Sequence, residues 1–352
     1  MKVCLSHMTA LHWLLRHFNP RQRGDRASRA TTVPSCAPGI AEAQEIRQVI
    51  GASLPAGKDG GEPPIDVVVS RREGRSSSAE VTSHLCSSRL PAGSFVPLHI
   101  RGFDLWVTSP ELTFVHLAGE LDVAGAAYVG MALCSGFRLE ELDVSGTVRR
   151  RPPDEPLTTV SRIGAFLRRA GNLRGVAKAR RALKYVRDGA LSPPEAGIAL
   201  VAEMRPALGG YSLGEVSLNE GFRVYAGLSP AGKPVFSTRY PDVVIRHRDD
   251  QGNLRLLGID HDPTLTHGGE LRRSLDLERG NQLESCRRLV HFTFTNLQTS
   301  DYSAFASSMD QVRRALGKRR EPREEQGELA RRIDCERRDL WERFVHGWST
   351  ML

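Results

Sequence analysis

Residues 239–297 decide the fold of the C-terminal half, and they read RYPDVVIRHRDDQGNLRLLGIDHDPTLTHGGELRRSLDLERGNQLESCRRLVHFTFTNL. Two short apolar runs in this stretch each carry an acid, Asp242 in PDVVI and Asp260 in LLGIDHD, and Asp262 follows two positions later. His267 comes five residues after Asp262. Neighbouring strands of a sheet lie about 5 Å apart, so carboxylates on two such strands can share one cation. The stretch therefore predicts adjacent strands with an acidic site between them.

The residue types of this predicted site suit a hard metal ion. Asp260 and Asp262 are two positions apart, so on a strand they face the same side. Mg²⁺ prefers oxygen ligands, and such an ion can activate water and stabilise charge on a phosphate under attack. We expect Asp242 and Asp260 to bind Mg²⁺ (or Mn²⁺). The alternative is an exposed strand end whose acids are solvated.

The chain on either side of these strands predicts an α/β core. Ser192-Pro193-Pro194-Glu195 is a helix start with a capping serine, and capping alone would explain Glu195. The order from Ser192 is α-β-β-β-α-β-α, which indicates a core with a mixed central sheet. The predicted strands are 222–228, 241–245, 254–260 and 288–296, and the later helices are 269–286 and 302–317.

The N-terminal half predicts an α+β domain over residues 1–150, with loose structure in 19–64 where Pro, Gly, Ser and Arg dominate. Its start is interpreted as an amphipathic helix. The proline-rich segment 147–156 predicts a linker, so we expect a second domain over 151–320 and a C-terminal helix over 321–352. That helix carries one apolar stripe, which we expect to pack on the body or on a second copy in a homodimer. His116 lies among apolar residues and is interpreted as a core histidine.

Composition favours a polyanionic partner. The 352 residues carry a net charge of +8, which suits nucleic acid. Six cysteines are spread along the chain with no CxxC pair, as in a protein with reduced thiols. No apolar run reaches the roughly 18 residues that a membrane span needs. We therefore expect a cytoplasmic protein.

One helix pattern, residues 173–188, presents a row of cations. Arg174, Lys178, Arg181 and Lys184 fall largely on one side, opposite an apolar side. Such a row can follow a phosphate backbone, so we predict that it binds nucleic acid. The alternative is a solvated helix face.

The block from Ser192 to Gly317 resembles the PD-(D/E)XK superfamily of restriction-endonuclease-like proteins, in particular its branch similar to very-short-patch-repair endonucleases. The resemblance rests on the order of five short motifs over about a third of the chain. They are Ser192-Pro193 with Glu195, then Pro241-Asp242, then Ile259-Asp260-His261-Asp262 with His267, then Asp276, Arg279, Asn281 and Leu283, and finally HFTFTN at 291–296.

The resemblance implies a metal-dependent endonuclease that hydrolyses phosphodiester bonds, of the repair or phage-defence type, with double-stranded DNA as the expected partner. It implies that Asp242 and Asp260 bind the metal, that Asp262 and His267 position or deprotonate the attacking water, and that Glu195 supports the site. Arg279 would contact a phosphate, or else pair with Asp276. This chain has Asp260 where the family pattern has glutamate, which puts activity in doubt.

The N-terminal part is vaguely similar to AbiEi-like antitoxins of an abortive-infection system, in SHMTAL near the start and in VTSPELTFVHLAGEL. That similarity carries no catalytic residues. It suggests a recognition or regulatory domain attached to the nuclease-like one. A second hypothesis is a non-catalytic DNA-binding regulator of antitoxin type on a degenerate nuclease fold, and Asp260 in place of glutamate is the feature that favours it. A third class, an enzyme that binds a small phosphate ligand, has little support because neither common glycine-rich phosphate loop occurs.

Overall fold

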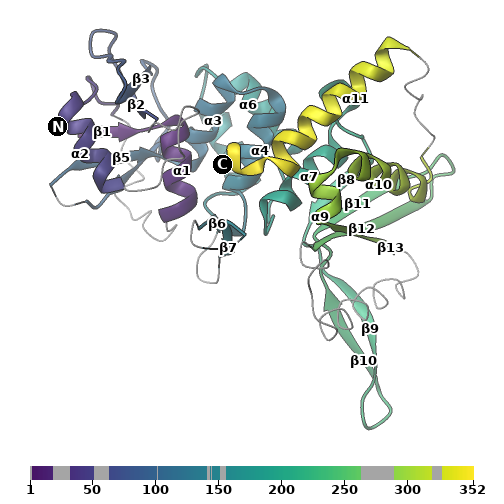
Figure 1. Cartoon of the computed structure of the whole chain (residues 1–352). Helices are drawn as coiled ribbons and strands as arrows, with labels where there is room; N and C mark the ends of the chain where they lie inside the picture. Colours follow the sequence, from purple (N-terminus) through teal and green to yellow (C-terminus); the bar gives the residue numbers. More distant parts are fainter. Residues whose placement is uncertain are drawn as a thin grey trace. The chain divides into compact units, whose positions relative to one another are not determined.

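The computed structural model describes residues 2–18, 32–50, 63–100, 102–140, 143, 145–150, 156–262, 289–318 and 327–352. The chain forms two compact units, Met1–Val186 and Arg187–Met351 (Figure 1). Each unit combines helices with a mixed sheet, which confirms the predicted α/β fold class.

The division between the units lies further along the chain than the segment 147–156 in which the sequence analysis set it. Helices α5 (Val160–Arg169) and α6 (Val176–Ala182) explain the difference, because both pack on helix α3 (Pro110–Glu120) of the first unit. Gly175, just before α6, has φ +95°, and a Cβ there would lie 2.2 Å from the carbonyl oxygen of Val115. The proline-rich segment is therefore followed by two more helices of the same unit.

The first unit is built on a five-stranded sheet in the order β3-β2-β1-β5-β4. Strand β1 is parallel to β5 and antiparallel to β2, β2 is parallel to β3, and β4 is antiparallel to β5. The strands are β1 (Lys2–Leu5), β2 (Ile65–Val69), β3 (Val81–Leu85), β4 (Phe95–Leu98) and β5 (Asp104–Thr108).

Strand β1 corrects the expectation that the chain begins with a helix. Val3, Cys4 and Leu5 are buried in the middle of the sheet, and helix α1 (His7–His17) begins only after them. Four residues are too short a run for periodicity to distinguish a strand from the first turn of a helix. The pairing partners lie about 60 and 100 residues further along the chain, and they decide the outcome.

Two helices of the first unit begin at side chains that accept backbone N–H groups of the first turn. The Ser109 hydroxyl accepts the N–H of Leu112 at 3.3 Å at the start of α3, and the Asp122 carboxylate accepts the N–H of Gly125 at 2.7 Å at the start of α4. The remaining elements are α2 (Ile40–Ile50), α4 (Val123–Leu133), β6 (Phe137–Leu139) and β7 (Thr147–Arg149), the last two forming a small antiparallel pair.

The second unit is built on a four-stranded sheet in the order β13-β12-β11-β8. In this sheet β11 is antiparallel to both β8 and β12, and β13 lies parallel to β12. This confirms the predicted mixed central sheet. The elements are α7 (Pro193–Glu203), β8 (Glu215–Leu218), β11 (Val243–Arg248), β12 (Leu254–Asp262), β13 (Leu289–Thr295), α9 (Asn296–Ser300) and α10 (Tyr302–Ala315). The helix predicted over 269–286 lies outside the described residues.

A hairpin, β9 (Phe222–Leu228) with β10 (Pro234–Arg239), is inserted between β8 and β11 and projects from this sheet (Figure 1). Residues 222–228 were expected to form the first strand of the central sheet, and this expectation is wrong. The shorter strand β8 occupies that position instead. The sequence GEVSL is too brief to stand out as a strand, whereas the more apolar 222–228 pairs locally with 234–239.

The C-terminal helix α11 (Glu328–Trp341) and the π-helical turn after it, Glu342–His346, pack on α7. Leu340 and Phe344 of the predicted apolar stripe are buried in this unit, and Leu329 is exposed. A Cβ at Gly197 of α7 would lie 2.1 Å from the Phe344 carbonyl oxygen, so only glycine permits this approach. Over the described parts of the chain, no helix is both long and apolar enough to cross a membrane.

Candidate functional site

The predicted acids Asp242 and Asp260 meet at one end of the central sheet. The register pairs Val243 of β11 with Ile259 of β12, which sets Asp242 across from Asp260. The Asp242 N–H donates to Oδ1 of Asp260 at 3.1 Å, and the His261 N–H donates to Oδ2 of Asp242 at 2.7 Å. Each carboxylate is therefore held by the backbone of the strand that carries the other one. The two strands keep both acids at one position with little side-chain freedom.

Glu195 has the capping role that the sequence permitted. It accepts the Ser192 hydroxyl at 2.9 Å and the Leu191 N–H at 2.9 Å, and its Oε2 also accepts the Asn219 side-chain amide at 3.2 Å. Burial raises the pKa of Glu195, and the charge of Asp260 raises it further, so the two carboxylates lie within electrostatic reach.

Asn219 connects Glu195 to the acid pair. While its side chain donates to Glu195, its backbone N–H donates to the carbonyl oxygen of Asp242 at 3.0 Å. The start of α7 is thus hydrogen-bonded to the start of β11 through one residue. Glu195 therefore contacts the acid pair only indirectly, through the residue that holds the Asp242 carbonyl.

His291 is a site residue that the sequence reasoning missed. It lies on β13, and its Nε2 is 3.3 Å from Oδ2 of Asp260, with the histidine side chain 7% exposed. The motif HFTFTN was used for the resemblance, but only the parallel register of β12 with β13 brings this ring beside Asp260. No spacing within the sequence reveals that register.

The carboxylates of Asp242 and Asp260 fit a hard cation as a pair. A carboxylate oxygen that accepts one N–H keeps a further lone pair, so both groups can still bind an ion. Mg²⁺ commonly takes one or two protein carboxylates and retains waters. Asp262 ends β12 and is half-buried. His267 and Arg279, which the sequence also proposed for this site, lie outside the described residues.

The predicted cationic helix is present as α6, but it is shorter than predicted. One of its cations, Lys178, makes a hydrogen bond within the protein. Lys178 donates from Nζ to the carbonyl oxygen of Leu121, at the end of α3, at 2.5 Å. It therefore caps a helix of its own unit, which corrects the expectation that it faces a phosphate. Arg174, Arg181 and Lys184 are exposed as predicted.

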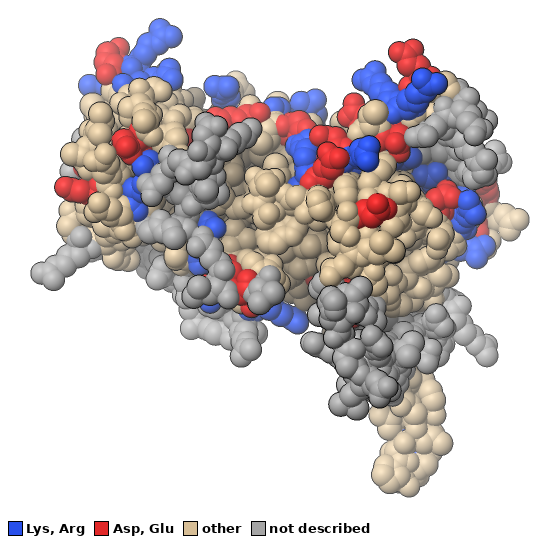
Figure 2. Space-filling model, viewed as in Figure 1, with Lys and Arg blue, Asp and Glu red and all other residues tan. Residues whose placement is uncertain are grey.

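The projecting hairpin carries large apolar side chains that are exposed to solvent. Tyr225 and Phe236 contact each other edge to face and are 47% and 48% exposed, and the Arg223 guanidinium lies over the Phe236 ring at 4.3 Å. In Figure 2 basic and acidic side chains intermingle on the face shown, while the hairpin presents uncharged side chains there. The base of the hairpin is anchored, because Val224 packs with Leu289 of β13.

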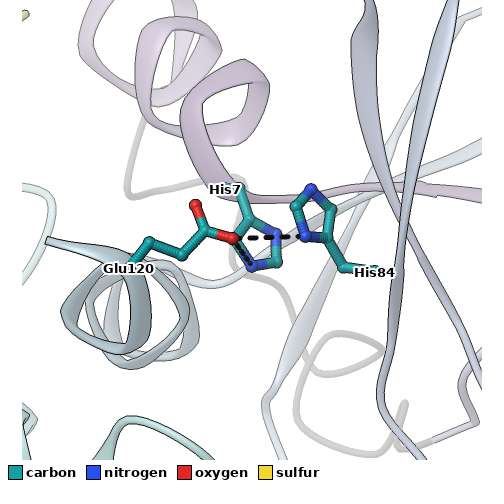
Figure 3. A group of neighbouring side chains, drawn as sticks. All are labelled: His7, His84 and Glu120. Carbon is teal, nitrogen blue, oxygen red and sulfur yellow. Dashed lines mark ion pairs between the residues drawn. The ribbon is translucent and has the colours of Figure 1, made fainter. Parts of the chain in front are cut away.

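The first unit contains a histidine cluster that the sequence did not reveal. His7, at the start of α1, stacks on His84 of β3 with ring centroids 3.5 Å apart, and His116 also stacks with His7, with ring centroids 4.7 Å apart. One oxygen of Glu120, at the end of α3, lies 3.5 Å from Nε2 of His7 and 3.3 Å from Nδ1 of His84 (Figure 3). These residues are too far apart in the chain for any motif to connect them.

The histidines of this cluster have opposite electrostatic environments. Burial lowers the pKa of His7, and the neighbouring His116 and His84 lower it further. The pKa of His84 is raised to about 9, because burial is outweighed by hydrogen bonds to Asp66 and Glu120. His116 was interpreted as a core histidine, but in the structure it is only half-buried and its Nδ1 has no hydrogen-bond partner among the described residues. The burial that it has lowers its pKa to about 4. His7 also has φ +48°, a backbone conformation that costs a non-glycine residue on the order of 1 kcal/mol.

Comparison with known proteins returns no match, whether to a family model, to a curated protein or to a solved structure.

Proposed function

We propose that the unit Arg187–Met351 is a metal-dependent endonuclease-like module that hydrolyses phosphodiester bonds in DNA. The observation that carries the proposal is the pair of carboxylates, Asp242 and Asp260, opposed at one end of adjacent strands and fixed by two reciprocal backbone hydrogen bonds. The mixed sheet that holds them and the motif order from Ser192 onward support the same conclusion.

In this proposal Asp242 and Asp260 hold Mg²⁺ (or Mn²⁺). When bound, such an ion activates a water and stabilises the charge on the phosphate. Asp262, at the end of β12, orients the water that attacks the phosphorus. His291 keeps Asp260 in place from β13, and Glu195 does the same for Asp242 through Asn219.

The projecting hairpin supports a DNA partner. It is inserted between β8 and β11, and only two residues separate its end at Arg239 from Asp242. A two-stranded ribbon fits the major groove of DNA. Arg223 and the exposed aromatic side chains of the hairpin offer contacts to phosphates and to base edges. The exposed cations Arg174, Arg181 and Lys184 of the first unit are a second surface that suits the phosphate backbone.

A plasmid-cleavage assay on the full chain tests the proposal. We expect nicking or cutting in Mg²⁺ or Mn²⁺ and none in EDTA. Asp260→Asn keeps an oxygen that accepts the Asp242 N–H but removes the charge, so it should lower the rate at least about a hundredfold. Asp250→Asn, at an exposed acid in the turn after β11, is the matched control and should keep the wild-type rate. Equal rates in the two variants would contradict the proposal.

One observation favours the alternative, a non-catalytic DNA-binding regulator of the antitoxin type. An oxygen of each acid accepts a backbone N–H, and the other oxygen of Asp260 faces His291, so the acids have structural partners without any ion. The same assay separates the two functions when paired with a gel-shift measurement. A chain that binds DNA tightly and leaves the plasmid intact in every metal is a regulator.

A further inference from the structure

We propose that His7, His84 and Glu120 form a binding site for a divalent transition-metal ion of the Zn²⁺ class in the first unit. Its remaining coordination position faces a cationic pocket that takes a small oxyanion. The site is separate from the acid pair of the second unit, and neither proposal depends on the other.

Two of the three donor–donor separations already match those that one such ion requires. Nε2 of His7 and Nδ1 of His84 are 3.5 and 3.3 Å from the same Glu120 oxygen, and the three ligand atoms all lie within 4.8 Å of one another (Figure 3). Two donors at about 2.0–2.2 Å from a tetrahedral ion are about 3.3–3.6 Å apart. Two imidazole nitrogens with one carboxylate are a ligand set that Zn²⁺ accepts and that Mg²⁺ does not favour.

Outer partners fix which nitrogen each ring presents. Nδ1 of His7 lies 2.9 Å from the Ser6 hydroxyl, and Nε2 of His84 lies 2.9 Å from a carboxylate oxygen of Asp66. The second oxygen of Asp66 accepts the N–H of Thr9 at 3.3 Å. A metal-bound histidine typically has such a partner, often a carboxylate, on its other nitrogen, which fixes the ring and its tautomer. Both histidines here are oriented in that way toward Glu120.

The ligands come from three elements of one packed unit. His7 begins α1, His84 lies on β3 and Glu120 ends α3. His7 has a left-handed backbone, with φ +48°, and such conformations concentrate at functional sites. Because the two rings are stacked with an angle of 19° between them, an ion between their nitrogens requires them to fan apart about their side-chain bonds.

The open position is inferred from the number of ligands and from the surroundings. Three protein ligands leave a tetrahedral ion one exchangeable position, as in catalytic rather than structural zinc sites. The cluster lines a pocket of about 500 Å³ whose wall also includes Arg75, Arg174 and Asn172. Two guanidinium groups and an amide suit a phosphate or carboxylate group. This assigns Arg174 to the pocket, in addition to the surface row predicted from the sequence.

Metal titration of the chelator-treated full chain tests the site. Exposed thiols also bind Zn²⁺, so the measurement is made in the background Cys36→Ser with Cys335→Ser. We expect one tight Zn²⁺ equivalent per chain. Glu120→Gln, which keeps the size of the side chain, should weaken binding about a hundredfold, and Glu45→Gln, at an exposed acid on α2, should leave it unchanged.

The outer partner provides a second, independent readout. Asp66→Asn leaves all three ligands in place, and loss of such a partner weakens metal affinity about 10–100-fold. A merely structural role for Asp66 would lower thermal stability without changing metal affinity. His99→Gln, at an exposed histidine, is the control for nonspecific binding by imidazole. The proposal is overturned if Zn²⁺ uptake is absent, or if Glu120→Gln and Asp66→Asn bind as tightly as their controls.

The exchangeable position is tested with inorganic phosphate on the Co²⁺-loaded chain. We expect phosphate to change the visible spectrum of the bound Co²⁺ in the wild-type protein. Arg174→Gln should raise the phosphate concentration needed about tenfold. A spectrum that phosphate leaves unchanged would overturn the open position, since a closed site has no place for the anion.

Discussion

At the scale of single residues, the length of the Asp260 side chain decides whether the acidic site is degenerate or is built for an aspartate. The resembled family has glutamate where this chain has Asp260, which suggested a degenerate site. In the structure Asp260 is 8% exposed, and its two oxygens lie 3.1 Å from the Asp242 nitrogen and 3.3 Å from Nε2 of His291. These contacts fit an aspartate, so the surroundings are built for the shorter side chain.

We therefore expect Asp260→Glu to lower cleavage and stability together. One extra methylene carries the carboxylate past the Asp242 N–H, and loss of that hydrogen bond should cost about 1 kcal/mol of unfolding free energy. The measurements are plasmid cleavage in Mg²⁺ and Mn²⁺ and a denaturant titration, with Asp260→Asn as the variant that keeps the acceptor oxygen. Faster cleavage by Asp260→Glu would instead mean that the wild-type site is degenerate.

A second residue, Glu203 at the end of α7, predicts a dependence of stability on pH. Burial raises its pKa to about 7 from 4.5, although Arg187, with which it pairs, opposes the shift. Between these two values the folded state binds more protons than the unfolded state, so stability falls as pH rises through the window. Glu203→Gln should reduce this loss of unfolding free energy with rising pH, by at most about 3 kcal/mol.

This pH prediction is checked by denaturant unfolding at about pH 5 and about pH 8, on either side of most of the window. Glu336→Gln, at an exposed acid of α11, is the control and should keep the wild-type slope. If Glu203→Gln and wild type lose the same stability between the two pH values, Glu203 is not the group responsible.

The sequence predicted part of the candidate sites, and the limit is physical. Asp242 and Asp260 were predicted because each lies next to a short apolar run, and the two runs lie within about twenty residues of each other. His291 was not, because its place beside Asp260 depends on a parallel register across a connection of 26 residues, 263–288. His7, His84 and Glu120 converge only when α1, β3 and α3 pack, and local patterns carry no information about that packing.

At the scale of elements, the hairpin β9–β10 is the feature that the sequence misassigned. Alternation and β-propensity identified 222–228 as a strand, and it is one. What the sequence predicted wrongly was the pairing partner of this strand. The choice between pairing with a nearby strand and joining a distant sheet depends on register and burial. The misplacement matters for function, because an inserted and exposed hairpin is free to contact a partner, whereas a central strand is not.

We expect the hairpin to contribute to DNA binding through its aromatic side chains. Tyr225→Ala combined with Phe236→Ala should weaken binding about tenfold. The thermal midpoint should change little, because both side chains are about half exposed. Leu254→Ala, at a similarly exposed apolar residue at the other end of β12, is the matched control.

The salt dependence of binding separates the contributions within the hairpin. Loss of the two aromatic rings removes no charge, so the slope of log affinity against log salt concentration should stay unchanged. Arg223→Gln should reduce that slope by about one, because one contact to a phosphate is lost. Affinities are measured by fluorescence anisotropy over a series of salt concentrations. Identical affinities for the aromatic variant and Leu254→Ala would show that the hairpin does not touch DNA.

At the scale of the whole molecule, two compact units predict two unfolding transitions. Ile163 of α5 and Ile245 of β11 are both fully buried, one in each unit. Ile→Val costs about 0.5–1.5 kcal/mol, or a few degrees in a unit of this size. Ile163→Val should lower only the transition of the first unit, and Ile245→Val only that of the second.

Calorimetry of the full chain measures both transitions, and metals identify them. Zn²⁺ should raise the transition that Ile163→Val lowers, and Mg²⁺ the one that Ile245→Val lowers, since each ion stabilises the fold that binds it. If Ile163→Val lowers the transition of the second unit instead, the division lies near residue 150, where the sequence set it.

The junction that carries the hairpin has a consequence for how such a protein can be altered. Leu218 and Val243 are paired neighbours in the sheet, so the chain leaves and re-enters at almost the same point. Doubling the length of an inserted loop costs only about 0.6 kcal/mol of closure entropy. The part of the hairpin beyond Val224, which packs with Leu289, is therefore a natural grafting point, at which ribbons of other lengths and sequences can be exchanged while the acid pair stays fixed. Under the proposed function, the choice of target could then be re-engineered, or could diverge in evolution, independently of the sheet.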